Sequence, residues 1–245
     1  MTSSTRAKTS PETETVRVER TFPRFARGQR WEHGLLMLTF FVLLITGLPQ
    51  KYRLASWSQQ VLSSPERVEL IRTVHHIAAI LLALEALYHI GRGITLLARR
   101  RLSADIFPTV QDIRDAGQMI RYLLFLTDRQ PRYGKYTFEQ KYTYWFLFFG
   151  IAIMGISGFI IWFPVLFTRV LPGGIVPAAK LAHSTEAIVS AIFFVIWHFY
   201  HVHVERLNLS VFTGRMSEGD MEQYHTLEYQ RLSDASEKSP TGDTQ

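Results

Sequence analysis

Four long apolar segments, separated by charged stretches, constrain this 245-residue chain more than any other feature of its sequence. They cover residues 33–48, 74–98, 143–167 and 181–202, with Trp31, Trp145, Trp162 and Trp197 at their ends. A helix needs about 20 apolar residues to cross a bilayer, and three of the four segments meet that length. Lipid offers no partner to a free backbone N–H or C=O, so spanning segments must be helical. We therefore expect an all-α integral membrane protein, a bundle of four transmembrane helices.

Lysine and arginine set the expected orientation of these spans. Five arginines lie in residues 17–30 and nine lysines or arginines in residues 99–141, whereas connections 49–70 and 168–180 are far poorer in both. Cytoplasmic loops of membrane proteins carry an excess of these residues. Both termini and the central loop are therefore expected in the cytoplasm of a multi-pass inner-membrane protein.

The same pattern divides the chain into three parts. Residues 1–23 are rich in Ser, Thr and Glu and lack an apolar leader, so we expect a disordered cytoplasmic arm. Residues 24–207 form the membrane domain, with a cytoplasmic loop at 99–140 in which residues 109–126 have the periodicity of an amphipathic surface helix. Residues 208–245 are expected to be a polar cytoplasmic tail.

Composition excludes several kinds of site. The chain has no cysteine, which excludes disulfides, thiolate-bound iron–sulfur or zinc centres and covalent haem attachment. The net charge of +6 is the charge expected of cytoplasmic membrane loops, and we expect no nucleic-acid partner. Any metal must therefore be bound by His, Met, carboxylate or carbonyl groups.

Histidines stand at two depths in the second and fourth spans. His75 and His89 are 14 residues apart, and His183 and His198 are 15 apart. At about 100° and 1.5 Å per residue, these separations return a side chain to within ~40° and ~60° of one face after ~20 Å. The two spans run in the same direction, so His75 is expected level with His183 and His89 level with His198.

Two opposed imidazoles at each of two levels predict two stacked b-type haems in the bundle core. A single histidine at a helix end is usually an interfacial polar residue, but four paired in depth on two parallel helices are not explained that way. Glycines in the first and third spans would make room for the porphyrins, although glycine also serves plain helix packing. They are Gly34, Gly47, Gly150, Gly155 and Gly158.

Other histidines leave the inner site open. His33 begins the first span at the cytoplasmic end and could replace His89 opposite His198, or pair with His201 or His203 around a third haem. His201 is 18 residues from His183, which is almost the same helix face, so it also remains a candidate inner ligand.

Three stretches resemble the four-helix di-haem cytochrome b subunits of membrane oxidoreductases, typified by the gamma subunit of respiratory formate dehydrogenase. They are GQRWEHGLLMLTFFVLLITGLP, GKYTFEQKYTYW leading into GISGFIIW, and AHSTEAI…WHFYHVH, and the similarity covers about residues 24–207. The resemblance implies that His33 and His198 bind the inner haem, and that His183 with His75 or His76 binds the outer one. Spans two and four also resemble cytochrome b of the bc complexes, which implies His89 instead; we favour His33.

The resemblance also implies a respiratory-chain function. Electrons would pass between an extracytoplasmic partner, an iron–sulfur or multihaem cytochrome c subunit with a separate catalytic subunit, and membrane quinone. Candidate quinone contacts are Thr137, Gln140 and Lys141, with Thr137 standing where formate dehydrogenase has an asparagine. Alternatives of another class are a transition-metal transporter or a haem-free membrane anchor, but the sequence shows no internal repeat typical of transporters.

Overall fold

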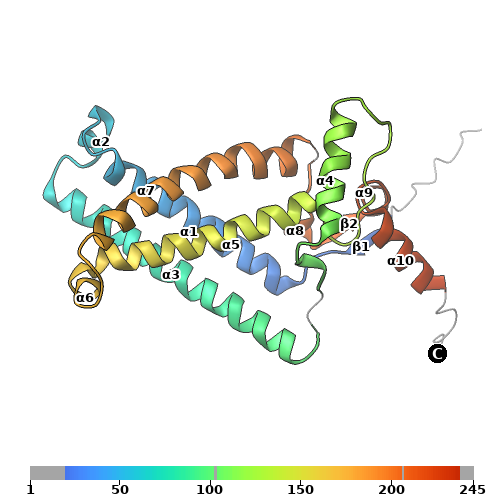
Figure 1. Ribbon diagram of the computed structural model, residues 1–245, viewed down its shortest axis with the longest axis horizontal. Helices are drawn as coiled ribbons and strands as arrows, with labels where there is room; N and C mark the ends of the chain where they lie inside the picture. Colours follow the sequence, from blue (N-terminus) through green and yellow to red (C-terminus); the bar gives the residue numbers. More distant parts are fainter. Residues whose placement is uncertain (1–19, 102–103, 206, 238–245) are drawn as a thin grey trace, which may run out of the picture.

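The structure is a computed structural model that describes residues 20–101, 104–205 and 207–237. Its four longest helices run lengthwise in Figure 1 and are each long and apolar enough to cross a membrane. They are α1 (Arg27–Lys51), α3 (Pro65–Ala98), α5 (Phe138–Trp162) and α7 (Ile175–Phe193), the last continuing in irregular helix to Val204. The expected four-helix membrane bundle is therefore confirmed. Helices α1 and α3 and the fourth span begin six to nine residues before the predicted apolar segments 33–48, 74–98 and 181–202.

The four helices pack as two antiparallel hairpins. α1 lies along α3 and α5 along α7, while contacts between the two pairs are sparse. In the 18-residue stretch of highest hydropathy in each span, only 6–17% of the residues are buried within the protein. Most side chains of the spans thus keep some exposed surface, as expected of helices whose solvent is lipid.

The third span ends earlier than the sequence predicted. Residues 143–167 were expected to be one continuous helix, but α5 ends at Trp162 and a short helix α6 (Pro164–Thr168) follows. Proline disfavours helical geometry at the residue before it, and Phe163 has φ −120° and ψ 55°. A second short helix, α2 (Ser56–Val61), lies at the same end of the molecule (Figure 1).

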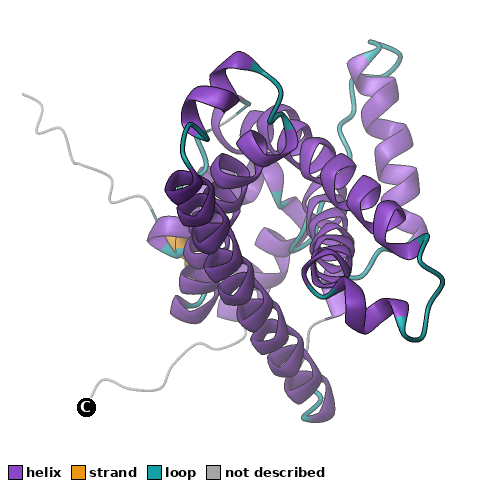
Figure 2. Ribbon diagram, turned by 90° about the vertical axis from the view of Figure 1, so that its left-hand side faces the viewer, coloured by secondary structure: helices purple, strands orange, loops and turns teal. Residues whose placement is uncertain are grey.

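The opposite end carries a small folded layer. A strand β1 (Thr21–Pro23) pairs antiparallel with β2 (Arg215–Ser217), followed by α9 (Glu218–Tyr224) and α10 (Thr226–Glu237). Short α8 (Ser210–Thr213) and the 3₁₀ turn η1 (Ala104–Ile106) complete it. These two strands are the sole non-helical regular elements of the described chain (Figure 2).

This layer joins residues from both ends of the chain, and the expected division at residues 23 and 208 stays a prediction. The last residues of the arm 1–23 form β1, and the described part of the tail 208–245 folds against them, because their backbones pair. Residues 1–19 and 238–245 lie outside the described residues.

Helix α4 (Val110–Leu123) forms within the segment where an amphipathic helix was expected. Figure 1 shows it running across the direction of the four spans, at the end where the strands lie. Its polar side faces the protein, with Asp115 buried, whereas Ile113 and Ile120 are exposed. The apolar side of α4 thus faces away from the bundle.

Candidate functional site

Two histidine pairs lie between helices at two levels of the bundle. In the outer pair, His75 on α3 faces His183 on α7, with ring centres 6.4 Å apart and planes at 67°. In the inner pair, His33 on α1 faces His198 beyond α7, with ring centres 6.3 Å apart and planes at 37°. All four rings are partly buried.

The separation within each pair is chemically informative. Two imidazoles on opposite sides of one metal ion, with metal–nitrogen bonds of about 2 Å, have ring centres about 6 Å apart. Both pairs match this spacing, while direct stacking or a hydrogen bond between rings would bring them closer. The levels are separated by the 15 residues between His183 and His198, about 22 Å of helix rise.

Hydroxyl groups of neighbouring helices hold the outer rings. Thr46 Oγ1 on α1 lies 2.9 Å from His75 Nδ1, and Ser157 Oγ on α5 lies 3.1 Å from His183 Nδ1. Each hydroxyl donates its proton to a backbone carbonyl four residues earlier, at 2.6 Å in both cases. It can therefore only accept from the imidazole, which assigns the proton to Nδ1 and leaves the lone pair of Nε2 free. That tautomer is the one a metal ligand requires.

A glycine follows each of these hydroxyl residues. A Cβ at Gly47 would lie 3.3 Å from the His75 ring, and one at Gly158 would lie 3.2 Å from the His183 ring. Both glycines lie against the imidazoles, and the expectation that they also make room for a porphyrin stays a prediction. Thr46 and Ser157 were not among the predicted site residues. The repeated triplets ITG and ISG in two spans could have indicated them.

The inner pair depends on an irregular part of the fourth span. Residues Phe194–His198 and Tyr200–Val204 are π-helical, with Phe199 N–H bonded to Phe194 O. A π turn holds an extra residue, so each residue turns by less than the ~100° of an α-helix. This offsets the ~60° by which 15 α-helical residues would rotate His198 away from His183, and it directs the His198 ring to α1.

His89 belongs to a polar network and faces no other histidine ring within the described residues. Its Nδ1 is 2.8 Å from Glu32 Oε2 on α1, and its Nε2 is 3.1 Å from Tyr144 Oη on α5. Arg92 forms an ion pair with the same Glu32. One turn deeper on α3, Glu85 has Oε2 buried with no hydrogen-bond partner among the described residues. The network thus ties three helices together and occupies both nitrogens of His89.

The remaining span histidines have other contacts. His76 stacks on Trp162, with ring centres 4.0 Å apart and planes at 19°. His201 Nδ1 lies 2.6 Å from Glu205 Oε2, one turn further along the same helix. His203 is exposed and contacts the ring of Phe199. None of the three is opposite another histidine ring within the described part of the chain.

Residues 24–216 match the family described as prokaryotic cytochrome b561, a match that covers more than half of the 245-residue chain. This chain belongs to the prokaryotic cytochrome b561 family. It is therefore a multi-pass inner-membrane b-type cytochrome that binds haem b and takes part in electron transfer. The two imidazole pairs fit this cofactor in donor type and spacing.

A relative with a more specific description is the cytochrome b556 subunit of formate dehydrogenase from Haemophilus influenzae. It is 26% identical over 160 residues, which are 65% of this chain and 62% of the relative. The cytochrome thus spans less than two thirds of the length of the relative that it matches.

The three residues expected at a quinone pocket lie together at the start of α5. Thr137 is the N-cap of α5: its side chain accepts from Gln140 N, and Gln140 Oε1 accepts from Thr137 N, both at 3.3 Å. Gln140 Oε1 also accepts from Arg24 Nη2 at 3.2 Å. Within the described residues Gln140 engages only its carbonyl oxygen, so its amide Nε2 remains available as a donor.

Lys141 connects α5 to α4. Its Nζ lies 2.8 Å from Asp112 Oδ1, and both side chains are nearly buried, at 12% and 16% exposed. Burial acts to raise the pKa of Asp112, but hydrogen bonds from Lys141 and Thr109 outweigh it and hold the pKa below its usual range. The pair thus fixes the crossing helix α4 to the base of the third span.

Proposed function

We propose that this cytochrome holds two b haems, an outer one between His75 and His183 and an inner one between His33 and His198. The observation that supports this most directly is that both pairs have ring centres 6.3–6.4 Å apart, a spacing at which two imidazoles could bind one metal ion between them. The bound iron supplies one-electron chemistry. The chain supplies ligands, orientation and the polarity that tunes the potential.

This proposal leaves His89 without an iron. Both of its nitrogens have hydrogen-bond partners, Glu32 on one side and Tyr144 on the other. Coordination by Nε2 would require the Tyr144 contact to break, whereas His33 needs no such change. The choice of His33 agrees with the similarity to formate dehydrogenase gamma subunits, and two haems rather than three follow.

We further propose that the cytochrome exchanges electrons with quinone near the inner pair. Reduction of a quinone takes two electrons and two protons, so the site must reach water. At the cytoplasmic end of α5, Gln140 Nε2 can donate to a quinone carbonyl, and Lys141 Nζ offers further donors. Thr137 would act by fixing the orientation of Gln140 through the cap.

The electron partner would lie on the extracytoplasmic side. The relative from Haemophilus influenzae is named as a formate dehydrogenase subunit, which favours assembly with an iron–sulfur or multihaem cytochrome c subunit and a separate catalytic subunit. His75 with His183 and His33 with His198 would hold the haems that supply the electron path between that partner and quinone. The direction depends on the potentials of the partner and the quinone.

Haem counting in ligand variants tests the assignment. The purified chain is expected to contain two haems per polypeptide, with a reduced α-band of the b type and low-spin bis-imidazole EPR signals. His33→Ala is expected to lose one haem and keep the signal of the outer one. The matched variant His89→Ala removes a histidine at a similar depth and is expected to keep both.

Three haems per chain, or loss of a haem in His89→Ala with both retained in His33→Ala, would contradict the ligand assignment. Absence of any b-type α-band from the full chain would instead contradict the proposed cytochrome function, so the two failures are distinguishable.

A further inference from the structure

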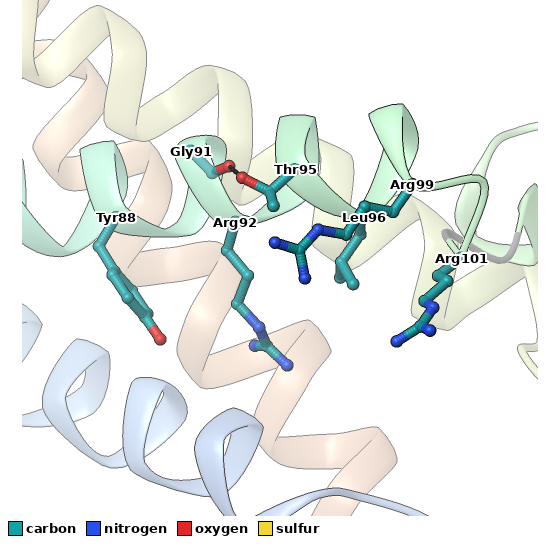
Figure 3. Close-up of a pocket in the computed structure, with 7 residues that line it drawn as sticks. All are labelled: Tyr88, Gly91, Arg92, Thr95, Leu96, Arg99 and Arg101. Carbon is teal, nitrogen blue, oxygen red and sulfur yellow. Dashed lines mark hydrogen bonds between the residues drawn. The ribbon is translucent and has the colours of Figure 1, made fainter.

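An arginine-lined groove lies beside the last three turns of α3, separate from the histidine pairs. It has a volume of about 490 Å³ and is lined by Tyr88, Gly91, Arg92, Thr95, Leu96, Arg99 and Arg101. In Figure 3 the side chains of Tyr88, Arg92 and Arg101 point to the same side of α3. Three of its seven lining residues are arginines, and no step of the proposed electron path uses it.

The charge of the groove is positive. Arg92 has an acidic partner, Glu32, but within the described residues neither Arg99 nor Arg101 forms an ion pair. Three arginines less one glutamate leave a formal charge of +2. The C-terminus of a helix carries about half a negative charge, which opposes an anion but is smaller than this excess.

The chain adopts a costly conformation to complete the groove. Arg100 has φ 51°, in the left-handed region that favours glycine, and Arg101 N–H bonds to Leu96 O at 2.9 Å. This closes the helix end with a turn that brings Arg101 back over Leu96. A non-glycine residue in this region costs about 1 kcal/mol or more and is retained where the surroundings require it.

The position of the groove selects the kind of ligand. Arg99 lies seven residues beyond Arg92, about 10 Å further along the helix toward the expected cytoplasmic headgroup region. Toward the bilayer centre the same side of α3 is mainly apolar, because Leu81, Leu84 and Tyr88 are exposed there, within about 80° of Arg92 around the helix. A ligand that fits this groove has a phosphate at one end and hydrocarbon along the rest of its length. A free phosphate or a nucleotide has no such hydrocarbon part.

We propose that this groove binds one anionic phospholipid of the cytoplasmic leaflet, with its phosphate at Arg99 and Arg101. Guanidinium groups recognise phosphate oxygens through paired hydrogen bonds, and basic pockets beside cytoplasmic helix ends suit anionic headgroups. Arg92 contributes its remaining donors, and its pairing with Glu32 connects the lipid to α1. The acyl chains lie along the apolar wall below.

Native mass spectrometry tests this proposal. The full chain is reconstituted with phosphatidylglycerol or with phosphatidylcholine and then released into detergent for the measurement. The wild type is expected to retain one phosphatidylglycerol and no phosphatidylcholine. Arg99→Gln combined with Arg101→Gln is expected to bind roughly 30-fold more weakly, since each guanidinium near an anionic surface contributes about fivefold. Arg99→Lys with Arg101→Lys is expected to retain most of the binding.

The matched control is Arg114→Gln combined with Arg121→Gln, which removes the same charge from the exposed surface of α4. It is expected to retain lipid like the wild type, and a wild-type haem spectrum in each variant establishes that the bundle is intact. Equal retention by the groove variant and the control would overturn the proposal. Equal binding of phosphatidylcholine, or displacement of the lipid by 10 mM inorganic phosphate, would also overturn it. Loss of haem in step with loss of lipid would overturn it too, because the arginines would then bind a haem propionate.

Discussion

The outer histidines show how neighbouring residues decide the chemistry of a ring. A neutral imidazole can bind iron through either nitrogen, and the hydrogen bond made by the other nitrogen selects which. Thr46 and Ser157 make this selection from two different helices, with the same geometry and the same following glycine. The inner rings make no hydrogen bond within the described residues. The two proposed haems should thus differ in the electron donation of their ligands.

Replacing Thr46 by valine should raise the midpoint potential of the outer haem. An acceptor at Nδ1–H makes the imidazole a stronger donor, which stabilises ferric iron, so removing it favours the ferrous state. A hydrogen bond worth ~1 kcal/mol corresponds to a shift of about 40 mV, since ~59 mV is ~1.4 kcal/mol for one electron. Optical redox titration measures both haems in one experiment.

The control for this prediction is Thr39→Val on the same helix, whose hydroxyl bonds only to the carbonyls of Leu35 and Leu36. It should leave both potentials unchanged. A shift of the inner haem rather than the outer in Thr46→Val would show that this hydroxyl does not act on the outer ligand.

Among the helices, irregular geometry occurs in the fourth span, where a side chain must reach α1. The π segments allow His198 to face α1 although its spacing from His183 is one residue too long for a regular helix. The polarity of α4 is likewise inverted relative to a helix on a soluble core, because its acidic side faces α5 and its apolar side faces outward. A nearly buried ion pair is costly to break by removing one partner.

The docking of α4 on α5 should weaken in acid. The folded-state pKa of Asp112 lies below its unfolded value of about 3.9. Its contribution is therefore fully present above about pH 4 and is lost as pH falls through the lower, folded pKa. Hydrogen exchange of α4 amides, measured between pH 3 and 6, should show protection that decreases below pH 4 by about 1–2 kcal/mol.

Asp112→Asn should remove this dependence and lower α4 protection at every pH, because Lys141 then keeps its burial without its partner. Asp115→Asn is the comparison, since that buried carboxylate accepts from Gln111 rather than from a cation. If wild type and Asp112→Asn showed the same pH profile, the ion pair would not hold α4.

For the whole molecule, periodicity and charge in the sequence were sufficient to predict the membrane bundle. Histidine spacing was sufficient to place His75 opposite His183 at one level. Spacing alone was not sufficient to predict the histidine opposite His198. A regular helix was assumed where the chain is π-helical, and no pattern in a single sequence indicates that change. The small folded layer was missed for a different reason: its strands have three residues each and pair across 192–196 positions of sequence. Local composition cannot reveal such a contact.

A single buried histidine joins the parts of that layer. His225, with no exposed surface, donates from Nδ1 to Gly134 O at 2.8 Å, and its Nε2 lies 3.4 Å from Arg24 Nη2. The residue that follows β1, the loop before α5 and the tail therefore meet at one ring. His225→Ala leaves a buried carbonyl without its donor, which costs about 1–3 kcal/mol before any cavity is counted. We expect faster hydrogen exchange in β1, β2 and α9 together, and easier proteolysis of the tail.

The haem content should not change in this variant, because both histidine pairs belong to the membrane helices and not to the small folded layer. His225→Asn should recover part of the protection, since an amide can still donate to Gly134 O, and His76→Phe at the far end of the bundle should leave the layer unaffected. If β2 exchanged faster in His225→Ala while β1 did not, the ring would stabilise the tail alone. If the haem were lost along with the layer, the bundle and the layer would form one cooperative unit, and the inner pair would depend on the tail for its geometry.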